Sequence, residues 1–196
     1  MREMIKMIVV LTVLSSFSGG LLAAVRNKTI DRIEVQQLTF VKGPAIQAIL
    51  EGASNDPIVD RFKLEYEGGE ASFFVGVFNG EPAKIAFESA GKGFGGEIGL
   101  MVGVDIKADK IIGVGVTTHS ETPGVGSKAQ TDPSFTKQFQ DMDLMSTFQV
   151  KTDGGQIDII TGATITSRGV AIGVTQAGAL YKSLKPQIEA KLKEFK

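Results

Sequence analysis

The sequence predicts an α+β protein in which an N-terminal transmembrane helix precedes a domain built on an antiparallel sheet with flanking helices. Three features of the chain support this prediction. Residues 7–25 contain no charged side chain. Runs of β-forming residues separated by turn signals follow between residues 62 and 118. Apolar side chains then recur at helical spacing after residue 166.

The composition limits the classes of function open to this chain. With 21 basic and 22 acidic residues the net charge is −1, so we expect no basic surface for nucleic acid. The sequence has no cysteine, which excludes disulfides, thiolate-bound iron–sulfur clusters and thioether-bound haem. His119 is the only histidine, so we expect no metal site either.

The charge-free segment Met7–Val25 is long enough to cross a bilayer, because a helix rises about 1.5 Å per residue and the hydrocarbon core is about 30 Å thick. A cleaved signal peptide is the alternative, since Leu22-Ala23-Ala24 ends in small residues. We favour a retained anchor over residues 1–27, because small residues in its middle suit packing against other transmembrane helices. Basic residues flank both ends, so they orient the helix only weakly.

Residues 28–57 are predicted to form a juxtamembrane helical stalk, and residues 58–196 the folded domain. In the stalk, Gly43-Pro44 separates two short helical patterns. The domain starts with an expected meander of strands, with Asn79-Gly80 as a tight hairpin turn between the last two. These strands are predicted at residues 62–66, 71–78 and 83–87.

A second hairpin is predicted from residues 98–106 and 111–118. One face is expected to be core, formed by Val102, Val104 and Ile106 opposite Ile112, Val114 and Val116. The other face carries glycines, which indicate close approach of either a packed helix or a ligand. These glycines are Gly99, Gly103, Gly113 and Gly115.

The last part of the chain is predicted to contain a short helix at residues 134–140, a strand at 156–160 and a long helix from about residue 166. Lys185-Pro186 is expected to kink or restart that helix. The apolar stripe of the long helix comprises Val170, Val174, Ala177, Tyr181 and Leu184.

A stretch rich in small residues and hydroxyls, Asp158–Ser167, lies between the last predicted strand and the last helix. A helix N-terminus offers free backbone N–H groups and the positive end of the helix dipole, so this place suits a phosphate group. The alternative is purely structural: a hydroxyl of Thr164, Thr166 or Ser167 caps the helix and Gly162 serves the turn.

The residues Asp158-x-x-Thr161-Gly162-Ala163-Thr164 resemble the flavinylation motif of the FMN-binding domain family, Asp-x-x-Ser/Thr-Gly-Ala-Thr. The resemblance implies that a flavin transferase takes FMN from FAD and joins its phosphate to the Thr164 hydroxyl as a phosphoester. The neighbouring candidates for cofactor binding are Thr161, Gly162, Ala163, Thr166 and Ser167.

A second stretch, His119–Gly126, resembles the family sequence His-x-Glu-Thr-Pro-Gly-Leu-Gly, with Val125 in place of leucine. The resemblance implies that this loop covers the flavin. Glu121 and Thr122 are candidate hydrogen-bond partners for the ring or the ribityl chain, and the carboxylate is a candidate for tuning the flavin potential. The loop candidates are His119, Glu121, Thr122, Pro123 and Gly124.

Within this family, the stretch Gly91–Ile98 is similar to Gly-Tyr-Gly-Gly-Pro-Ile of the G subunit of the Rnf complex, an ion-translocating ferredoxin:NAD oxidoreductase. This implies a single-pass electron-carrier protein among other membrane subunits. No residue of the sequence looks like a general acid, base or nucleophile for substrate turnover, so we expect no catalytic residues in the chain itself. Its FMN domain is expected on the periplasmic, extracytoplasmic side. The alternatives are a flavoprotein like the C subunit of the Na⁺-translocating NADH:quinone oxidoreductase, an exported module that binds a phosphate or nucleotide reversibly, and a structural assembly subunit.

Overall fold

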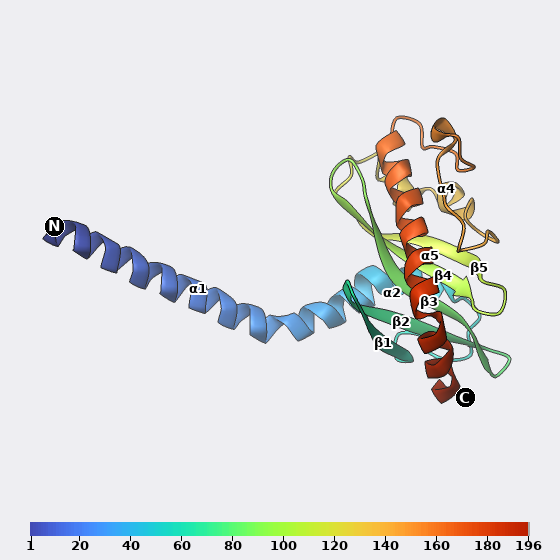
Figure 1. The fold of residues 1–196 in the computed structure, drawn as a ribbon, viewed down its shortest axis with the longest axis horizontal. Helices are drawn as coiled ribbons and strands as arrows, with labels where there is room; N and C mark the ends of the chain where they lie inside the picture. Colours follow the sequence, from blue (N-terminus) through green and yellow to red (C-terminus); the bar gives the residue numbers. More distant parts are fainter. Residues whose placement is uncertain (196) are drawn as a thin grey trace. The chain divides into compact units, whose positions relative to one another are not determined.

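A long helix opens the chain in the computed structural model, which describes residues 1–195 (Figure 1). This helix, α1, spans Arg2–Gln36 and is followed by a π-helical segment, Gln37–Lys42. Its stretch Arg2–Ile30 is long and apolar enough to cross a membrane, with a mean hydropathy of 2.2 and none of it buried. The chain forms two compact units, and the second one begins at Val41.

The second unit is built on a five-stranded sheet in the order β1-β2-β3-β4-β5. All neighbouring strands are antiparallel, so the sheet is a simple meander. Together with the flanking helices this confirms the predicted α+β fold class. The strands are β1 Arg61–Tyr66, β2 Gly69–Phe78, β3 Glu81–Lys92, β4 Glu97–Asp105 and β5 Lys110–Thr118.

The turn between β2 and β3 is the predicted Asn79-Gly80 hairpin. Both residues have positive φ, 53° and 79° respectively. Two consecutive left-handed residues match the right-handed twist of the paired strands, and asparagine followed by glycine tolerates this geometry best. Phe78 pairs with Glu81 across the turn, which confirms the predicted turn position.

One face of the sheet packs against the long C-terminal helix α5, Thr164–Leu192 (Figure 1). The row of paired residues Phe73, Phe87, Val102 and Val114 faces α5, and all of these are buried. Tyr181 of α5 stacks on Phe87 at 6.3 Å between ring centroids. The predicted apolar stripe of this helix is buried in the same cluster, which confirms that it is the core-facing side.

The opposite face of the sheet packs against α2, Gly43–Ile49. A Cβ atom on Gly103 would overlap Ile49, and one on Gly115 would lie 3.2 Å from the Cβ of Ala45. Close helix packing therefore explains these glycines, and ligand contact is not needed. Because α2 covers this face, the second unit includes part of the segment predicted as a stalk.

The backbone of the N-terminal half of α5 packs directly against the backbone of β3. A Cβ atom on Gly91 would overlap the carbonyl oxygen of Gly169, and one on Gly173 would lie 3.0 Å from the carbonyl of Ala90. Only glycine at these positions lets helix and strand come so close. This contact holds the N-terminal half of α5 close to the end of β3.

The predicted core face of the second hairpin is wrong at its turn end. Val102, Val104, Val114 and Val116 lie in the core as predicted, but Ile111 takes the place predicted for Ile112. The register shifts between Gly103 and Val104, so a β-bulge turns Ile111 into the core and Ile112 toward the α2 face.

The strand predicted at residues 156–160 is also wrong, because only Ile157 forms a bridge, in parallel with Val150. The outer edge of β5 is already occupied where Ile111 exchanges backbone hydrogen bonds with Asp141 and Met142. The Gln138 side chain both accepts from the Asp158 amide and donates to its carbonyl, and so replaces a strand partner.

Pro186 does not restart the last helix, which runs through it to Leu192. Proline blocks the hydrogen bond to the carbonyl four residues earlier, here that of Lys182. Both Pro186 and Lys182 are exposed, so water can reach that carbonyl. Burial of Leu184 and Ile188 on the opposite side keeps the helix against the sheet.

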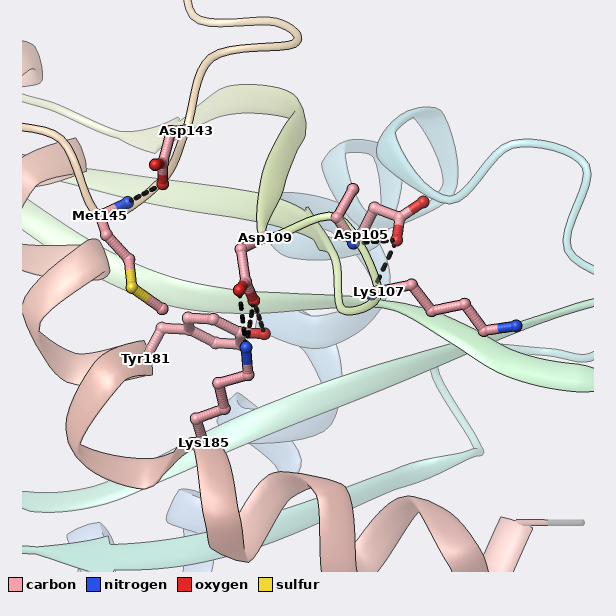
Figure 2. A network of polar contacts seen from close by, with 8 residues as sticks. Asp105, Lys107, Asp109, Asp143, Met145, Tyr181 and Lys185 are labelled. Carbon is pink, nitrogen blue, oxygen red and sulfur yellow. Dashed lines mark hydrogen bonds and ion pairs between the residues drawn. The ribbon is translucent and has the colours of Figure 1, made fainter.

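A network of hydrogen bonds connects α5 with the turn between β4 and β5 (Figure 2). Tyr181 Oη donates to Asp109 Oδ1 at 2.9 Å, and Lys185 Nζ donates to both oxygens of Asp109. Burial by itself raises the pKa of Asp109, but the bonds from Lys185 and Tyr181 outweigh it and lower that pKa below its usual value. Burial and the Asp109 carboxylate raise the pKa of Tyr181.

Three short helical segments lie between β5 and α5. They are α3, Lys128–Thr131, α4, Pro133–Lys137, and a 3-10 helix, Lys151–Asp153. Asp132 caps α4 by accepting from the amide of Ser134. The helix predicted at residues 134–140 is therefore present but ends three residues earlier.

Candidate functional site

A pocket of about 350 Å³ lies at the N-terminus of α5. It brings together the two sequence stretches singled out above, which are about forty residues apart in the chain. Of the predicted site residues, Glu121, Thr122, Gly162, Ala163, Thr164 and Thr166 line it. Phe94, Val125, Gly126 and Ile165 complete the lining.

The first turn of α5 presents backbone N–H groups to this pocket. Helix α5 begins at Thr164, and its N-cap residue is Ala163, which has no side chain to cap it. Within residues 1–195, the amides of Thr164, Ile165 and Thr166 have no hydrogen-bond acceptor. Three free donors at the positive end of a helix dipole form an anion site.

The hydroxyls near the helix start have different roles, and none caps the helix. Ser167 Oγ accepts from the Ile160 amide and donates to the Ala163 carbonyl, both at 2.9 Å. Thr166 Oγ1 donates to Glu121. Among the described residues, Thr164 Oγ1 has no hydrogen-bond partner, and Thr164 is half-buried in the pocket. The capping interpretation of these hydroxyls is therefore wrong.

The turn before α5 depends on Gly162, whose φ is +81°. Left-handed φ is costly for residues with a side chain, so the structural role predicted for Gly162 in the turn is confirmed. Thr161 is exposed and does not line the pocket. Asp158, the first residue of the motif, is also outside the pocket and pairs with Lys151 at 2.7 Å.

Glu121 is buried under the pocket wall, with 6% of its surface exposed. One carboxylate oxygen accepts from the Gly95 amide at 2.8 Å, and the other accepts from Thr166 Oγ1. The carboxylate therefore connects the loop after β3 with α5. Thr122, beside it, is exposed on the pocket side.

His119, Pro123 and Gly124 belong to the same loop but do not line the pocket. His119 Nδ1 accepts from the Glu121 amide at 3.2 Å, and Nε2 lies 3.2 Å from Gln130 Oε1. His119 thus holds the loop in shape from its outer side. The Gly124 amide donates to Ser127 Oγ at 2.8 Å, which closes the turn.

Three exposed apolar side chains that sequence reasoning did not select surround the pocket. Phe94 is 72% exposed, Ile165 47% and Val125 39%. Phe94 lies in the loop Gly93–Gly96, and a single aromatic residue among glycines was the available signal for it. The pocket therefore combines an anion site with apolar surface for a flat ring.

An ion pair connects Arg168 of α5 with Asp153, which precedes the helix in the chain. Arg168 donates to both oxygens of Asp153, at 2.6 and 2.7 Å. The hydrogen bond from Arg168 lowers the pKa of Asp153 below its usual value. Both side chains are partly exposed, so the pair contributes little to stability.

Comparison with known proteins places the chain in a family. The model of the FMN-binding domain family matches residues 93–179, which include the whole pocket lining. The G subunit of the ion-translocating oxidoreductase complex of Shewanella oneidensis is 33% identical over 188 residues, 90% of this chain and 88% of that protein.

Two solved structures share the fold of the domain. One is the C subunit of the Na⁺-translocating NADH-quinone reductase from Parabacteroides distasonis, with a TM-score of 0.51 and 26% identity over 58% of this chain and 62% of that chain. The other is NqrC of Shewanella oneidensis, with a TM-score of 0.55, 22% identity and coverage of 70% and 72%, which supports the fold alone. By its similarity along most of its length, the chain belongs to the family of G subunits of ion-translocating oxidoreductase complexes and contains an FMN-binding domain.

Proposed function

We propose that this protein carries FMN covalently, as a phosphoester on Thr164, and passes electrons within a membrane-bound ion-translocating ferredoxin:NAD oxidoreductase of the Rnf type. The observation that carries the proposal is the pocket at the start of α5. There, within the part of the chain that the structure describes, the Thr164 hydroxyl has no partner and lies in the same cavity as amides that lack acceptors. The relationship to the G subunits of ion-translocating oxidoreductase complexes supports the role in the complex.

The pocket fits the parts of FMN. Cofactor pockets usually have volumes of about 300–1,000 Å³ with mainly apolar walls and few polar groups. The volume of about 350 Å³ and the side chains of Phe94, Val125 and Ile165 meet this description. The amides of Thr164, Ile165 and Thr166 are donors for phosphate oxygens, and Thr122 is a donor for the ribityl chain or the ring.

The attachment step is a phosphoryl transfer that a separate flavin transferase catalyses. Thr164 Oγ1 forms a bond to the FMN phosphorus of FAD, and the pyrophosphate bond breaks so that AMP leaves. The hydroxyl proton passes to a base of the transferase. The half-exposed position of Thr164 supports access by another protein, whereas Thr166 and Ser167 are buried.

The chain acts as an electron carrier. Bound FMN supplies one-electron and two-electron redox chemistry, and the protein supplies its position and surroundings. The hydroxyl–carboxylate pair of Thr166 and Glu121 in the pocket wall is buried, so we assign no pocket residue a role in substrate turnover. Turnover therefore belongs to the assembled complex with its other membrane subunits.

We further propose that residues 1–27 anchor the chain as a single pass and that the folded unit, which begins at Val41, lies on the outer side of the membrane. The span Arg2–Ile30 supports the anchor. Covalent attachment suits an exported domain, because a reversibly bound cofactor is lost where its free concentration is low.

Fluorescence of the protein in a denaturing gel tests this proposal. The full-length protein made with a flavin transferase should give an ultraviolet-excited band, and Thr164→Ala should abolish it. Thr166→Ala is the matched control, because its hydroxyl lies in the same pocket, and its band should persist after long incubation. A reversibly binding module predicts no band for any variant, and a structural subunit predicts unchanged electron flux in Thr164→Ala membranes.

A further inference from the structure

Glu121 occupies a buried point at which three chain segments meet. The loop 119–127 carries it, the loop 93–96 donates to it through the Gly95 amide, and α5 donates through Thr166 Oγ1. Each carboxylate oxygen therefore already accepts a bond from the protein. The segments are distant in sequence, so this side chain is a direct connection between two walls of the pocket.

Glycine backbones enclose the same carboxylate. A Cβ atom on Gly93 would overlap Glu121 Oε1, and one on Gly126 would lie 2.6 Å from Oε2. A Cβ on Gly95 would overlap the carbonyl of Ser120, the residue before Glu121. Such close packing leaves the carboxylate no room to turn away from Gly95 and Thr166.

The two groups that Glu121 holds are neighbours of the groups that matter for flavin. Gly95 follows Phe94, the exposed aromatic side chain on one pocket wall. Thr166 lies in the first turn of α5, two residues after Thr164. Glu121 therefore connects the loop that carries Phe94 with the helix turn that carries Thr164, and so it sets the distance between the aromatic wall and the acceptor hydroxyl.

We infer that Glu121 is a positioning residue for flavin attachment, one that fixes the Phe94 loop against the first turn of α5 and engages the Thr166 hydroxyl so that Thr164 presents the free one. This inference rests on the proposed function. It gives Glu121 a role different from contact with the flavin ring, because its oxygens are directed to protein donors.

Four single variants and one double variant of the full-length protein test this inference. Glu121→Gln keeps the shape but replaces one acceptor oxygen with an NH2 donor and removes the negative charge, so neither Gly95 nor Thr166 keeps a charge-assisted hydrogen bond. Thr166→Val removes the hydroxyl and keeps the volume, and Thr166→Ser restores the hydroxyl. Glu97→Gln is the matched control, because Glu97 is exposed at the start of β4 in the same region.

The measurement is the kcat/KM of purified flavin transferase for each variant, with FAD as donor and covalent fluorescence as readout. Loss of one charge-assisted hydrogen bond corresponds to a decrease of roughly tenfold, which we expect for Glu121→Gln and for Thr166→Val. Thr166→Ser and Glu97→Gln should stay near the wild-type value. The double variant Glu121→Gln/Thr166→Val should be no slower than either single one, because both remove the same connection.

Wild-type rates for Glu121→Gln and Thr166→Val would overturn the inference, and so would a Thr166→Ser rate as low as that of Thr166→Val. Hydrogen exchange of the unloaded protein gives an independent readout: in Thr166→Val, the Gly95 amide should exchange about tenfold faster. If the wild-type protein accepts no covalent flavin, the proposed function fails, and unchanged Gly95 exchange would separately refute the positioning role.

Discussion

Replacement of Asp109 by asparagine should destabilise the protein in a pH-dependent way. Asp109 accepts three hydrogen bonds, one from Tyr181 and two from Lys185, and its side chain is 29% exposed. Asparagine can still accept from Tyr181 but loses the ionic partner of Lys185. A hydrogen bond to a charged group contributes about 1.5–3 kcal/mol, and partial exposure reduces this, so we expect a loss of about 1–2 kcal/mol.

The pH dependence follows from the lowered pKa of Asp109. Because the folded-state pKa lies below the unfolded one, the stabilisation is complete above the unfolded value, near 3.9, and is lost as the pH falls through the folded value. The difference between wild type and Asp109→Asn should therefore be constant near neutral pH. It should shrink as the solution becomes more acidic than about pH 4.

Thermal unfolding of the full-length protein in detergent, followed by circular dichroism at several pH values, measures this difference. A loss of about 1–2 kcal/mol corresponds to a decrease in Tm of roughly 2–8 °C for a chain of this size. Exposed Glu97→Gln serves as the control and should leave Tm unchanged. An Asp109→Asn effect that is absent, or that is equally large in acid, would refute the role assigned to this network.

Three further substitutions test other parts of the structure. Gly91→Ala should destabilise the domain by about 2–4 kcal/mol in thermal unfolding, because the new Cβ would overlap the Gly169 carbonyl. Unchanged stability would contradict the close helix–strand contact. Phe94→Ala should increase iodide quenching of the fluorescence of attached FMN about twofold, since aromatic stacking contributes roughly 0.5–1.5 kcal/mol. Equal quenching in the variant and the wild type would show that the flavin ring lies away from Phe94. Ile46→Ala should lower the free energy of unfolding by about 2–4 kcal/mol, because Ile46 is fully buried on the α2 face. A smaller loss would show that α2 packs loosely on the sheet.

Local patterns predicted most of the domain correctly. The Asn79-Gly80 turn, the meander of strands and the buried stripe of α5 depend on neighbours in the sequence, and the structure confirms them. The strand prediction at residues 156–160 failed because the structure of this segment depends on a distant partner. The segment around Asp158 is not a strand because the Gln138 side chain satisfies its backbone, and no local pattern reveals that bond.

The candidate site was predictable in part for the same reason. The two motifs pointed to Glu121, Thr122 and Thr164, which the fold brings to one pocket. The position of Phe94 among glycines was a sequence signal, but its exposure was not predictable, because it depends on how the Gly93–Gly96 loop folds over Glu121. The sequence likewise could not show which hydroxyls near the helix start are hydrogen-bonded and which is free, because this depends on the three-dimensional arrangement.

Mass spectrometry of the full-length protein, produced with a flavin transferase and then denatured, tests the central claim most directly. We predict an added mass of one FMN less one water, and fragmentation that assigns it to Thr164. An unmodified mass under conditions in which a known substrate of the transferase is loaded would contradict the claim. Attachment to Thr166, Ser167 or another residue would contradict it as well.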